Sequence, residues 1–265
     1  MCQFLSVSRA AYYVWVQRMG QADRDQERMA LVKTAWENSR RTYGYRRITL
    51  WLRQQGWVIN HKAVRRLMNK LQIRSIARQP NAYRKAGSLS RPRLYANVLN
   101  RDFTAHKPNQ KWVTDITYIA TQQGWAFLSV IKDLFDGFII AHQLGRHSSI
   151  RLVLDTLEQA RQEVPQVEGV LLHSDQGFQY TSEQYFEWIH NQHLAPSMSR
   201  KGNCWDNAPI ESFFSQLKEE VLRHIDTPTL TEAQSLIEDY IHFYNYERIQ
   251  LKTKQTPYQT RCLSR

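Results

Sequence analysis

The sequence predicts an α/β protein in which an all-α part with a helix-turn-helix precedes a mixed five-stranded sheet flanked by helices. Up to about residue 111, apolar residues recur at helical spacing, and from Trp112 they form runs rich in β-branched and aromatic residues. The charge changes at the same point. Residues 1–111 contain 23 Lys and Arg against 5 Asp and Glu, whereas residues 112–265 contain 13 against 19. We therefore expect two parts with different tasks, and 265 residues suffice to bury a core in each.

Composition limits the class of protein. The three cysteines, Cys2, Cys204 and Cys262, are far apart in the sequence, so neither a disulfide framework nor a cysteine-rich zinc site is expected. No apolar run approaches the roughly 18–20 residues of a membrane span, and the first residues lack a signal-peptide pattern. We expect a cytoplasmic protein without membrane contact. Its strongly basic first part favours a polyanionic partner, most often nucleic acid, over a merely basic surface.

The first elements in chain order are short helices. Residues 1–25 are expected to form an N-terminal helical segment, and residues 26–76 a helix-turn-helix domain. One helix of that domain includes Met29, Val32, Ala35 and Trp36. The next has an apolar stripe at Ile48, Trp51 and Leu52, and Gly56 is its expected C-terminal stop.

A basic helix follows the expected N-cap Asn60. Its apolar stripe has the spacing i, i+3, i+4 and i+7, at Val64, Leu67, Met68 and Leu71. Its remaining surface carries Lys62, Arg65, Arg66, Asn69 and Lys70. In a helix-turn-helix the second helix enters the major groove, so these five residues are the predicted DNA contacts. A purely structural helical bundle with a basic surface is the alternative.

Residues 77–110 combine prolines with many basic residues and are predicted to be an extended basic linker. Such a segment can follow DNA phosphates, although solvation alone also explains its composition.

The second part has the predicted order β-β-β-α-β-α-β-α, which gives a mixed sheet with helices on its faces. The expected strands are residues 112–119, 125–132, 138–143, 169–173 and 195–198. Helices are expected after a cap at Ser148 or Ser149, near 182–192 and around 208–223. Residues 111–224 form the predicted core and residues 225–265 a C-terminal helical extension.

Three acids occupy distinct points of this predicted fold. Asp115 lies within the first strand, Asp175 follows the fourth strand, and Glu211 lies in the first turns of the last core helix. Taken singly, Asp115 can bond backbone amides, Asp175 can cap a turn, and Glu211 can be a surface acid near a helix N-terminus. Taken together, they favour a site for Mg²⁺ or Mn²⁺, which prefer hard oxygen ligands. Two such ions about 4 Å apart can cleave a phosphodiester by activating the nucleophile and stabilising the leaving oxygen.

Three segments, WVTDITYI, LLHSDQGFQYTS and SRKGNCWDNAPIESFFSQLKEE, resemble the DDE integrase core of bacterial insertion-sequence transposases. More narrowly, they resemble the B-frame (OrfB) proteins of two-frame insertion sequences, in which ribosomal frameshifting joins an A-frame protein to the B frame. Glu211 follows Asp175 by 36 positions, the D-35-E spacing of retroviral-type integrases. The block YGYRRITLWLRQQGWVINHKAVRRLMNKL resembles the helix-turn-helix that precedes that core.

The resemblance implies a ribonuclease H-like core with two Mg²⁺ ions. Asp115 would bridge both ions, and Asp175 and Glu211 would each complete one site. Lys218 stands where the family carries a basic residue that contacts DNA. Asn203 and Asn207 match the loop before the third acid, where they position DNA or the helix, or simply cap the helix.

The implied activity is cleavage at the 3′ end of an insertion-sequence element, followed by strand transfer that integrates it into DNA. The implied partners are transposon-end and target double-stranded DNA, the A-frame protein, and further copies of this chain in a dimer or larger multimer on DNA. The implied location is the bacterial cytoplasm, at the nucleoid. Two alternatives remain open: a DNA-binding regulatory partner of a fused transposase without its own catalysis, and a ribonuclease H-type nuclease acting on RNA–DNA hybrids.

Overall fold

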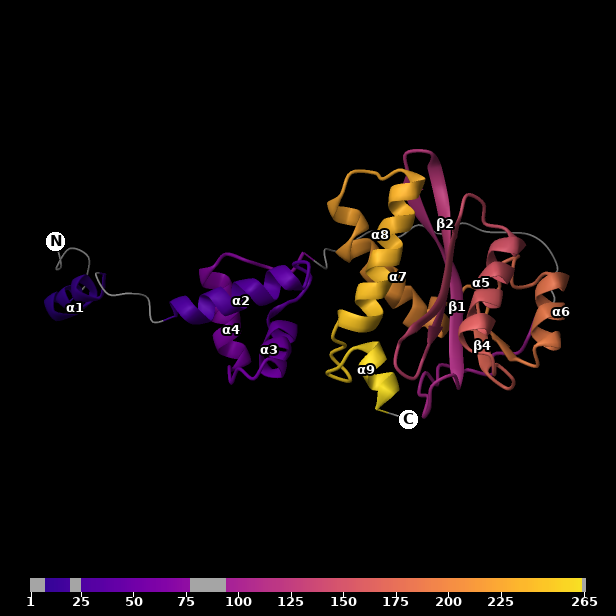
Figure 1. Cartoon of the computed structure of the whole chain (residues 1–265), viewed down its shortest axis with the longest axis horizontal. Helices are drawn as coiled ribbons and strands as arrows, with labels where there is room; N and C mark the ends of the chain where they lie inside the picture. The colour runs from indigo at the N-terminus through magenta and orange to yellow at the C-terminus, as the bar shows by residue number, and fades with distance from the viewer. Residues whose placement is uncertain (1–7, 20–24, 77–93, 264–265) are drawn as a thin grey trace. The chain divides into compact units, whose positions relative to one another are not determined.

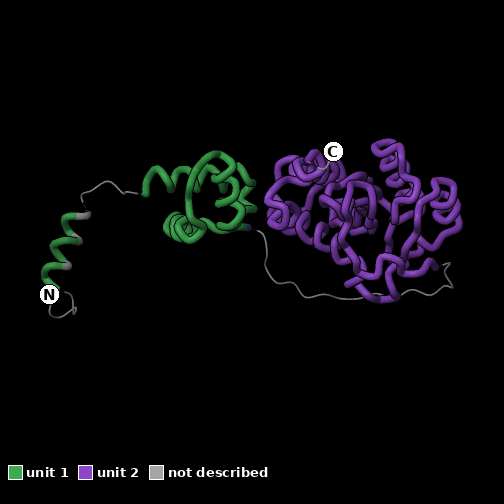
Figure 2. The backbone as a smooth tube through the Cα atoms, turned by 90° about the horizontal axis from the view of Figure 1, so that it is seen from below, with its two compact units in different colours: residues 1–75 green, residues 76–265 purple. Residues whose placement is uncertain are grey.

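The structure is a computed structural model that describes residues 8–19, 25–76 and 94–263. The chain divides into two compact units, residues 1–75 and residues 76–265, which Figure 2 shows in different colours. No helix in these described stretches is long and apolar enough to cross a membrane.

Unit 1 is all-α, as predicted. Its helices are α1 (Arg9–Met19), α2 (Gln26–Asn38), α3 (Tyr45–Gln54) and α4 (His61–Lys70). The predicted cap of α4 is confirmed, because the side chain of Asn60 accepts a hydrogen bond from the backbone N–H of Lys62 at 2.9 Å. Gly56 follows α3 with a φ of +86°, a conformation that favours glycine. The core of α2, α3 and α4 consists of Val32, Ala35, Ile48, Leu52, Val64, Leu67 and Met68.

Unit 2 contains the predicted mixed five-stranded sheet, with the strand order β3-β2-β1-β4-β5. The strands are β1 (Lys111–Thr121), β2 (Gly124–Asp133), β3 (Ile139–Gly145), β4 (Leu171–Ser174) and β5 (Ala195–Met198). The first three strands pair antiparallel, whereas β4 pairs parallel with both β1 and β5. The central strand β1 therefore connects the antiparallel half of the sheet to the parallel half.

Helices cover both faces of this sheet (Figure 1). One face carries α5 (Ile150–Glu163), with Ser149 as its N-cap, and α6 (Glu183–Asn191). The other face carries α7 (Ala208–Glu220), α8 (Leu230–His242) and α9 (Pro257–Cys262). Short turns complete the chain: 3₁₀ turns at Cys204–Asn207 and Leu222–His224, and a π-helical turn at Phe243–Glu247.

Part of the predicted linker is packed against the sheet instead. We call residues 94–101 the strap. The ring of Tyr95 stacks on that of Phe186 at a centroid distance of 4.3 Å, and Leu99 is buried. The backbone N–H groups of Val98 and Leu99 both donate to Oγ of Ser197, each at 3.0 Å. Composition alone predicted a linker here, because it gives no information about hydrogen bonds between the strap and β5. Of the rest of the predicted linker, residues 77–93 lie outside the described residues, and residues 102–110 lead into β1.

Two arginines attach the C-terminal extension to the core through ion pairs with buried acids. The guanidinium of Arg248 donates to both carboxylate oxygens of Glu220 in α7, at 2.6 and 2.9 Å. The hydroxyl of Tyr240 in α8 donates to the same carboxylate at 3.0 Å. Arg261 in α9 donates to Asp133 and Asp136 beside the β2–β3 turn, both at 2.6 Å. The C-terminal extension therefore helps to position α7, the helix that carries Glu211.

Candidate functional site

The fold brings the three predicted acids together where the parallel pairing of β1 and β4 ends. Val113 and His173 are register partners in the parallel pair, and Asp115 and Asp175 each lie two residues beyond them. Neighbouring strands lie roughly 4.8 Å apart, so the two carboxylates begin on adjacent backbones. Glu211 lies in the first turn of α7, which packs against β1.

Burial and mutual repulsion shape the charge of this site. Burial raises the pKa of Asp115 well above its usual value, and the charges of Asp175 and Glu211 raise that pKa further. Burial also raises the pKa of Asp175. The pKa of Glu211 is raised by burial and then by the charge of Asp175. Carboxylates from three separate elements therefore interact electrostatically at one place.

Backbone donors orient the two strand acids. The carboxylate of Asp115 accepts a hydrogen bond from the N–H of Ile116 at 2.7 Å, and that of Asp175 accepts one from the N–H of Gly177 at 2.8 Å. A Cβ atom at position 177 would lie only 2.9 Å from Oδ1 of Asp175. Glycine at this position therefore permits the close approach that holds the carboxylate in place.

Two hydrogen bonds fix the start of α7 against the sheet. The side-chain amide of Asn207 donates to the carbonyl of Thr114 at 3.3 Å, next to Asp115. The ammonium of Lys132 in β2 donates to the carbonyl of Pro209 at 3.1 Å. Asn207 is buried, and its side chain does not cap the helix. Its burial argues against the predicted DNA contact and instead gives Asn207 a role in positioning α7.

Lys218 lies on α7, two helical turns beyond Glu211. Its ammonium sits 4.7 Å from the ring centroid of Tyr118 on β1. Burial lowers the pKa of Lys218, while the nearby charge of Asp115 raises it. The structure therefore places the Lys218 cation near Asp115, and its contact with DNA stays a prediction.

The loop before α7 is held by Asp206. Its buried carboxylate accepts hydrogen bonds from Arg200, from Arg101 of the strap and from the side chain of Asn97. These donors lower the pKa of Asp206, with the bonds from Arg200 contributing most. Asn203 lies half-buried in the same loop, and its Oδ1 has no hydrogen-bond partner within the described residues.

Behind Asp175, His173 is fully buried. Its two ring nitrogens bond Oγ of Ser197 at 2.8 Å and Oγ of Ser199 at 3.0 Å. Burial lowers the pKa of His173 to about 4, so the ring is neutral at pH 7.

The donor set of this site is chemically suited to divalent cations. Asp175 raises the pKa of Asp115 and of Glu211, and Glu211 raises that of Asp115, because their negative charges repel; a cation between them relieves that repulsion. Carboxylate oxygens are the ligands that Mg²⁺ and Mn²⁺ prefer. Within the described stretches, no three His, Cys, Asp or Glu side chains are placed to hold a single ion together. An ion at this site would therefore have at most two carboxylate ligands from the chain as it stands.

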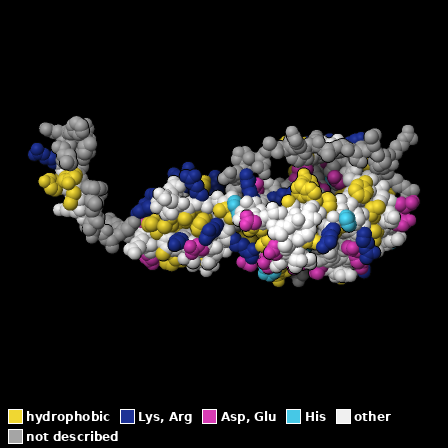
Figure 3. All heavy atoms as spheres, turned by 90° about the horizontal axis from the view of Figure 1, so that it is seen from above, with side chains coloured by type: hydrophobic (Ala, Val, Ile, Leu, Met, Phe, Trp, Pro, Cys, Tyr) yellow, Lys and Arg dark blue, Asp and Glu magenta, His cyan; other side chains and the backbone are white. Residues whose placement is uncertain are grey.

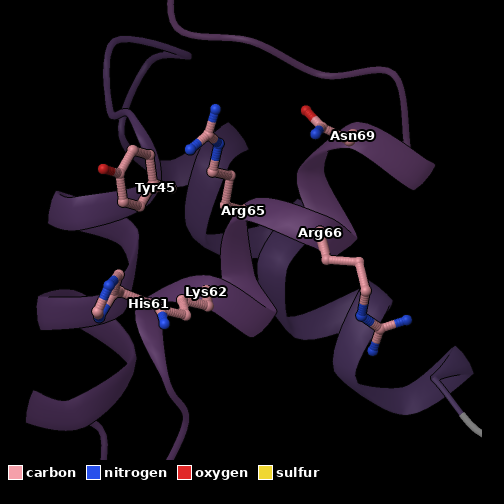
Figure 4. A pocket seen from close by; sticks show the side chains of 6 residues that line it. All are labelled: Tyr45, His61, Lys62, Arg65, Arg66 and Asn69. Carbon is pink, nitrogen blue, oxygen red and sulfur yellow. The ribbon is translucent and has the colours of Figure 1, made fainter.

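Unit 1 carries a second candidate surface, a pocket of about 440 Å³ between α3 and α4. Its lining residues are Tyr45, His61, Lys62, Arg65, Arg66 and Asn69 (Figure 4). The guanidinium of Arg65 lies 5.8 Å from the Tyr45 ring centroid, and Arg66 points away from Arg65. The predicted DNA contacts Lys62, Arg65, Arg66, Asn69 and Lys70 are all exposed.

One acid compensates part of this basic surface. Asp25, at the start of α2, accepts two hydrogen bonds from Arg66, at 2.6 and 2.9 Å, and lies 3.8 Å from the ammonium of Lys70. The bonds from Arg66 lower the pKa of Asp25. Lys62 and Arg65 lie on the part of α4 that lines the pocket with Tyr45. Over unit 2, by contrast, Figure 3 shows acidic and basic side chains interspersed.

Sequence reasoning missed three aromatic residues near the acids. Tyr180 is buried behind them; burial raises the pKa of its hydroxyl, and the charges of Asp115 and Asp175 raise it further. Tyr118 and Trp125 are exposed on the β1–β2 hairpin. Strand periodicity shows which residues share a face, but it does not show which of them remain uncovered.

Known domain families match nearly the whole chain. Residues 23–81 match an HTH-like domain, and residues 105–204 and 211–263 match integrase core domains. The fold is similar to a chain in the cryo-EM structure of the simian T-cell lymphotropic virus intasome in complex with PP2A regulatory subunit B56 gamma. That similarity has a TM-score of 0.51 at 13% identity and covers 86% of this chain and 73% of that one. The core thus has the predicted ribonuclease H-like fold.

Relatives in bacteria are much closer in sequence. The chain is 39% identical to a 31 kDa protein of insertion element IS600 from Shigella sonnei, over 94% of this chain and 92% of that protein. It is 36% identical to InsK of insertion sequence element IS150 from Escherichia coli K12, over 94% and 87%. It is also 36% identical to the transposase InsF of insertion sequence IS3A from the same strain, over 84% and 78%. With its helix-turn-helix unit and its integrase core, the chain belongs to the transposase family of bacterial insertion sequences.

Proposed function

We propose that the chain catalyses the metal-dependent cleavage of an insertion-sequence element at its 3′ ends and the transfer of those ends into DNA. The electrostatic interaction of Asp115, Asp175 and Glu211, contributed by three separate elements, carries this proposal. If all three acids had only structural roles, three carboxylates that repel one another would not be expected to lie together.

Each side chain has a distinct task in this proposal. Asp115, Asp175 and Glu211 would together hold two Mg²⁺ or Mn²⁺ ions. When bound, the ions activate the attacking oxygen and neutralise charge on the phosphodiester. Lys218 holds a DNA phosphate beside the acids. Asn207 and Lys132 act indirectly, because they position the first turn of α7.

Double-stranded DNA is the proposed substrate of both units. The exposed basic face of α4 contacts transposon ends, and the core acts on their phosphodiesters. Asn203 remains a proposed DNA contact in the loop before α7. Pairing of two ends requires more than one copy of the chain, and we propose that the A-frame protein also takes part. DNA binding would associate the protein with the bacterial nucleoid in the cytoplasm.

The test is a strand-transfer assay on labelled end DNA of the element that encodes the chain, with Mg²⁺, Mn²⁺ or EDTA, and with or without the A-frame protein. Glu211→Gln is expected to reduce joined product about 100- to 1,000-fold, the loss typical when one group that stabilises transition-state charge is removed. Glu219→Gln is the matched control, because it removes a carboxylate of the same helix that pairs with Arg223.

Protein stability provides a second readout. Mg²⁺ should raise the melting temperature of the wild type, because the ions bind only the folded chain. Asp115→Asn should abolish that rise. It should also stabilise the metal-free protein at pH 7, because it removes a buried charge repelled by Asp175 and Glu211.

Three outcomes would contradict the proposal. Undiminished joining by Glu211→Gln would refute the site. DNA binding without joining under any condition would favour the regulatory alternative. Cleavage of RNA–DNA hybrids without action on DNA would favour a ribonuclease H-type nuclease.

A further inference from the structure

Two large aromatic side chains are exposed together on the core. Tyr118 on β1 is 56% exposed and Trp125 on β2 is 61% exposed. Their rings meet edge to face, with centroids 5.3 Å apart and planes at 87°. Exposed aromatic rings leave apolar surface available to a partner, and here most of it belongs to Trp125 because Lys218 lies over the Tyr118 ring.

The backbone beneath the two rings is held firmly. Tyr118 pairs with Phe127 and Trp125 pairs with Ala120 in the antiparallel ladder of β1 and β2. The hairpin tip is tied to the start of α8, because Gln122 bonds the backbone of Thr227 and Pro228, and Gln123 accepts a hydrogen bond from the N–H of Leu230. The rings therefore project from a braced hairpin, and little conformational entropy of the backbone is lost when a ligand stacks on them.

Lys218 links the aromatic pair to the acids. Its ammonium lies 4.7 Å from the Tyr118 ring centroid and interacts electrostatically with Asp115. Asp115 and Tyr118 are three residues apart on β1, which corresponds to about 10 Å along an extended strand. Because successive side chains of a strand leave it on opposite faces, Lys218 is the group that connects the Tyr118 ring with Asp115.

We propose that Tyr118 and Trp125 form a stacking platform for an unpaired base of the DNA strand whose phosphodiester lies at the acids. This inference rests on the proposed function, because it takes DNA as the substrate. Aromatic faces next to a cation are the combination with which proteins hold single-stranded nucleic acid, since every base offers a π-face and every nucleotide a negative phosphate. The platform binds a frayed or opened end, and it gains nothing from a fully paired duplex.

The test places the fluorescent base 2-aminopurine at each of the first five unpaired positions of a duplex with a 3′ overhang. Binding is measured with the full chain in EDTA, so that no cleavage takes place. Stacking on the platform quenches 2-aminopurine, and we expect strong quenching at one or two of the five positions and weak quenching at the others. Trp125→Ala should remove this quenching and weaken binding of the overhang DNA about 5- to 100-fold, while a blunt duplex changes less than about twofold.

Matched variants separate stacking from folding. Trp125→Phe keeps an aromatic face and should restore most of the quenching. Tyr258→Ala removes a different exposed ring, which pairs with Tyr246 at 4.9 Å, and should leave the quenching intact. The platform would be overturned if quenching survives in the double variant Trp125→Ala with Tyr118→Ala. It would also be overturned if Tyr258→Ala loses as much quenching as Trp125→Ala.

The assay distinguishes the two proposals. Position-dependent quenching without any strand transfer would leave the platform standing and refute the catalytic proposal. If the wild type transfers strands but quenches 2-aminopurine at no position, the catalytic proposal stands and the platform is refuted.

Discussion

The buried pair of Glu220 and Arg248 provides the sharpest test of what holds α7 in place. Both side chains are at most 2% exposed, and the guanidinium binds both carboxylate oxygens. Glu220→Gln keeps the size of the side chain but removes its charge. The Arg248 cation then stays buried, between the Tyr244 ring at 5.4 Å and the neutral amide.

The expected loss follows from these contacts. Removing one partner of a buried ion pair costs about 3–5 kcal/mol, because the remaining charge is uncompensated. Tyr240→Phe deletes only the hydroxyl bond to Glu220, so it should cost about 1 kcal/mol. Replacing both charged partners, as in Glu220→Leu with Arg248→Met, should recover most of the loss.

Urea unfolding followed by circular dichroism measures these free energies. The neighbouring Glu219→Gln is the control, because its partner Arg223 is partly exposed and such pairs contribute at most about 1 kcal/mol. A Glu220→Gln variant that loses no more stability than Glu219→Gln would refute the argument that this pair anchors the C-terminal extension to α7.

Two further predictions concern charge. The unfolded chain takes up a proton on His173 below about pH 6.5, but the folded chain does so only near pH 4. The free energy of unfolding should therefore fall by about 3 kcal/mol as pH drops from 6.5 to 4. Unfolding curves of His173→Gln should lack this fall. The same pH dependence of stability in wild type and variant would contradict the buried neutral ring. Asp25→Asn should release Arg66 on α4, raise the affinity for duplex DNA and steepen its salt dependence by about one counterion, while stability changes little because the pair is solvent-exposed. Fluorescence anisotropy across a salt series checks this, and a rise of the same size in the exposed-pair control Glu37→Gln would contradict it.

The sequence predicted those features that depend on local patterns. The apolar stripe of α4, its Asn60 cap and the five strands all follow from spacing within a few residues. The nearness of Asp115 and Asp175 follows from the parallel pairing of β1 with β4. The strap was misread, because its bonds to Ser197 join residues that are about 100 positions apart. The ion pair between Arg248 and Glu220 could not be predicted either, because the neighbouring residues in the sequence do not identify the partner of either side chain.

The two kinds of strand pairing in the mixed sheet differ in how much chain entropy is lost when they form during folding. The antiparallel strands β1, β2 and β3 are contiguous in sequence, and a tight turn pairs Thr121 with Gly124. The parallel pairing of β1 with β4 joins Lys111 to Leu171, so it closes a loop of about 60 residues. Loop-closure entropy grows with loop length, which makes this second step the costlier one. It is also the step that brings Asp175 towards Asp115, so the least local contact of the sheet has to overcome both chain entropy and charge repulsion.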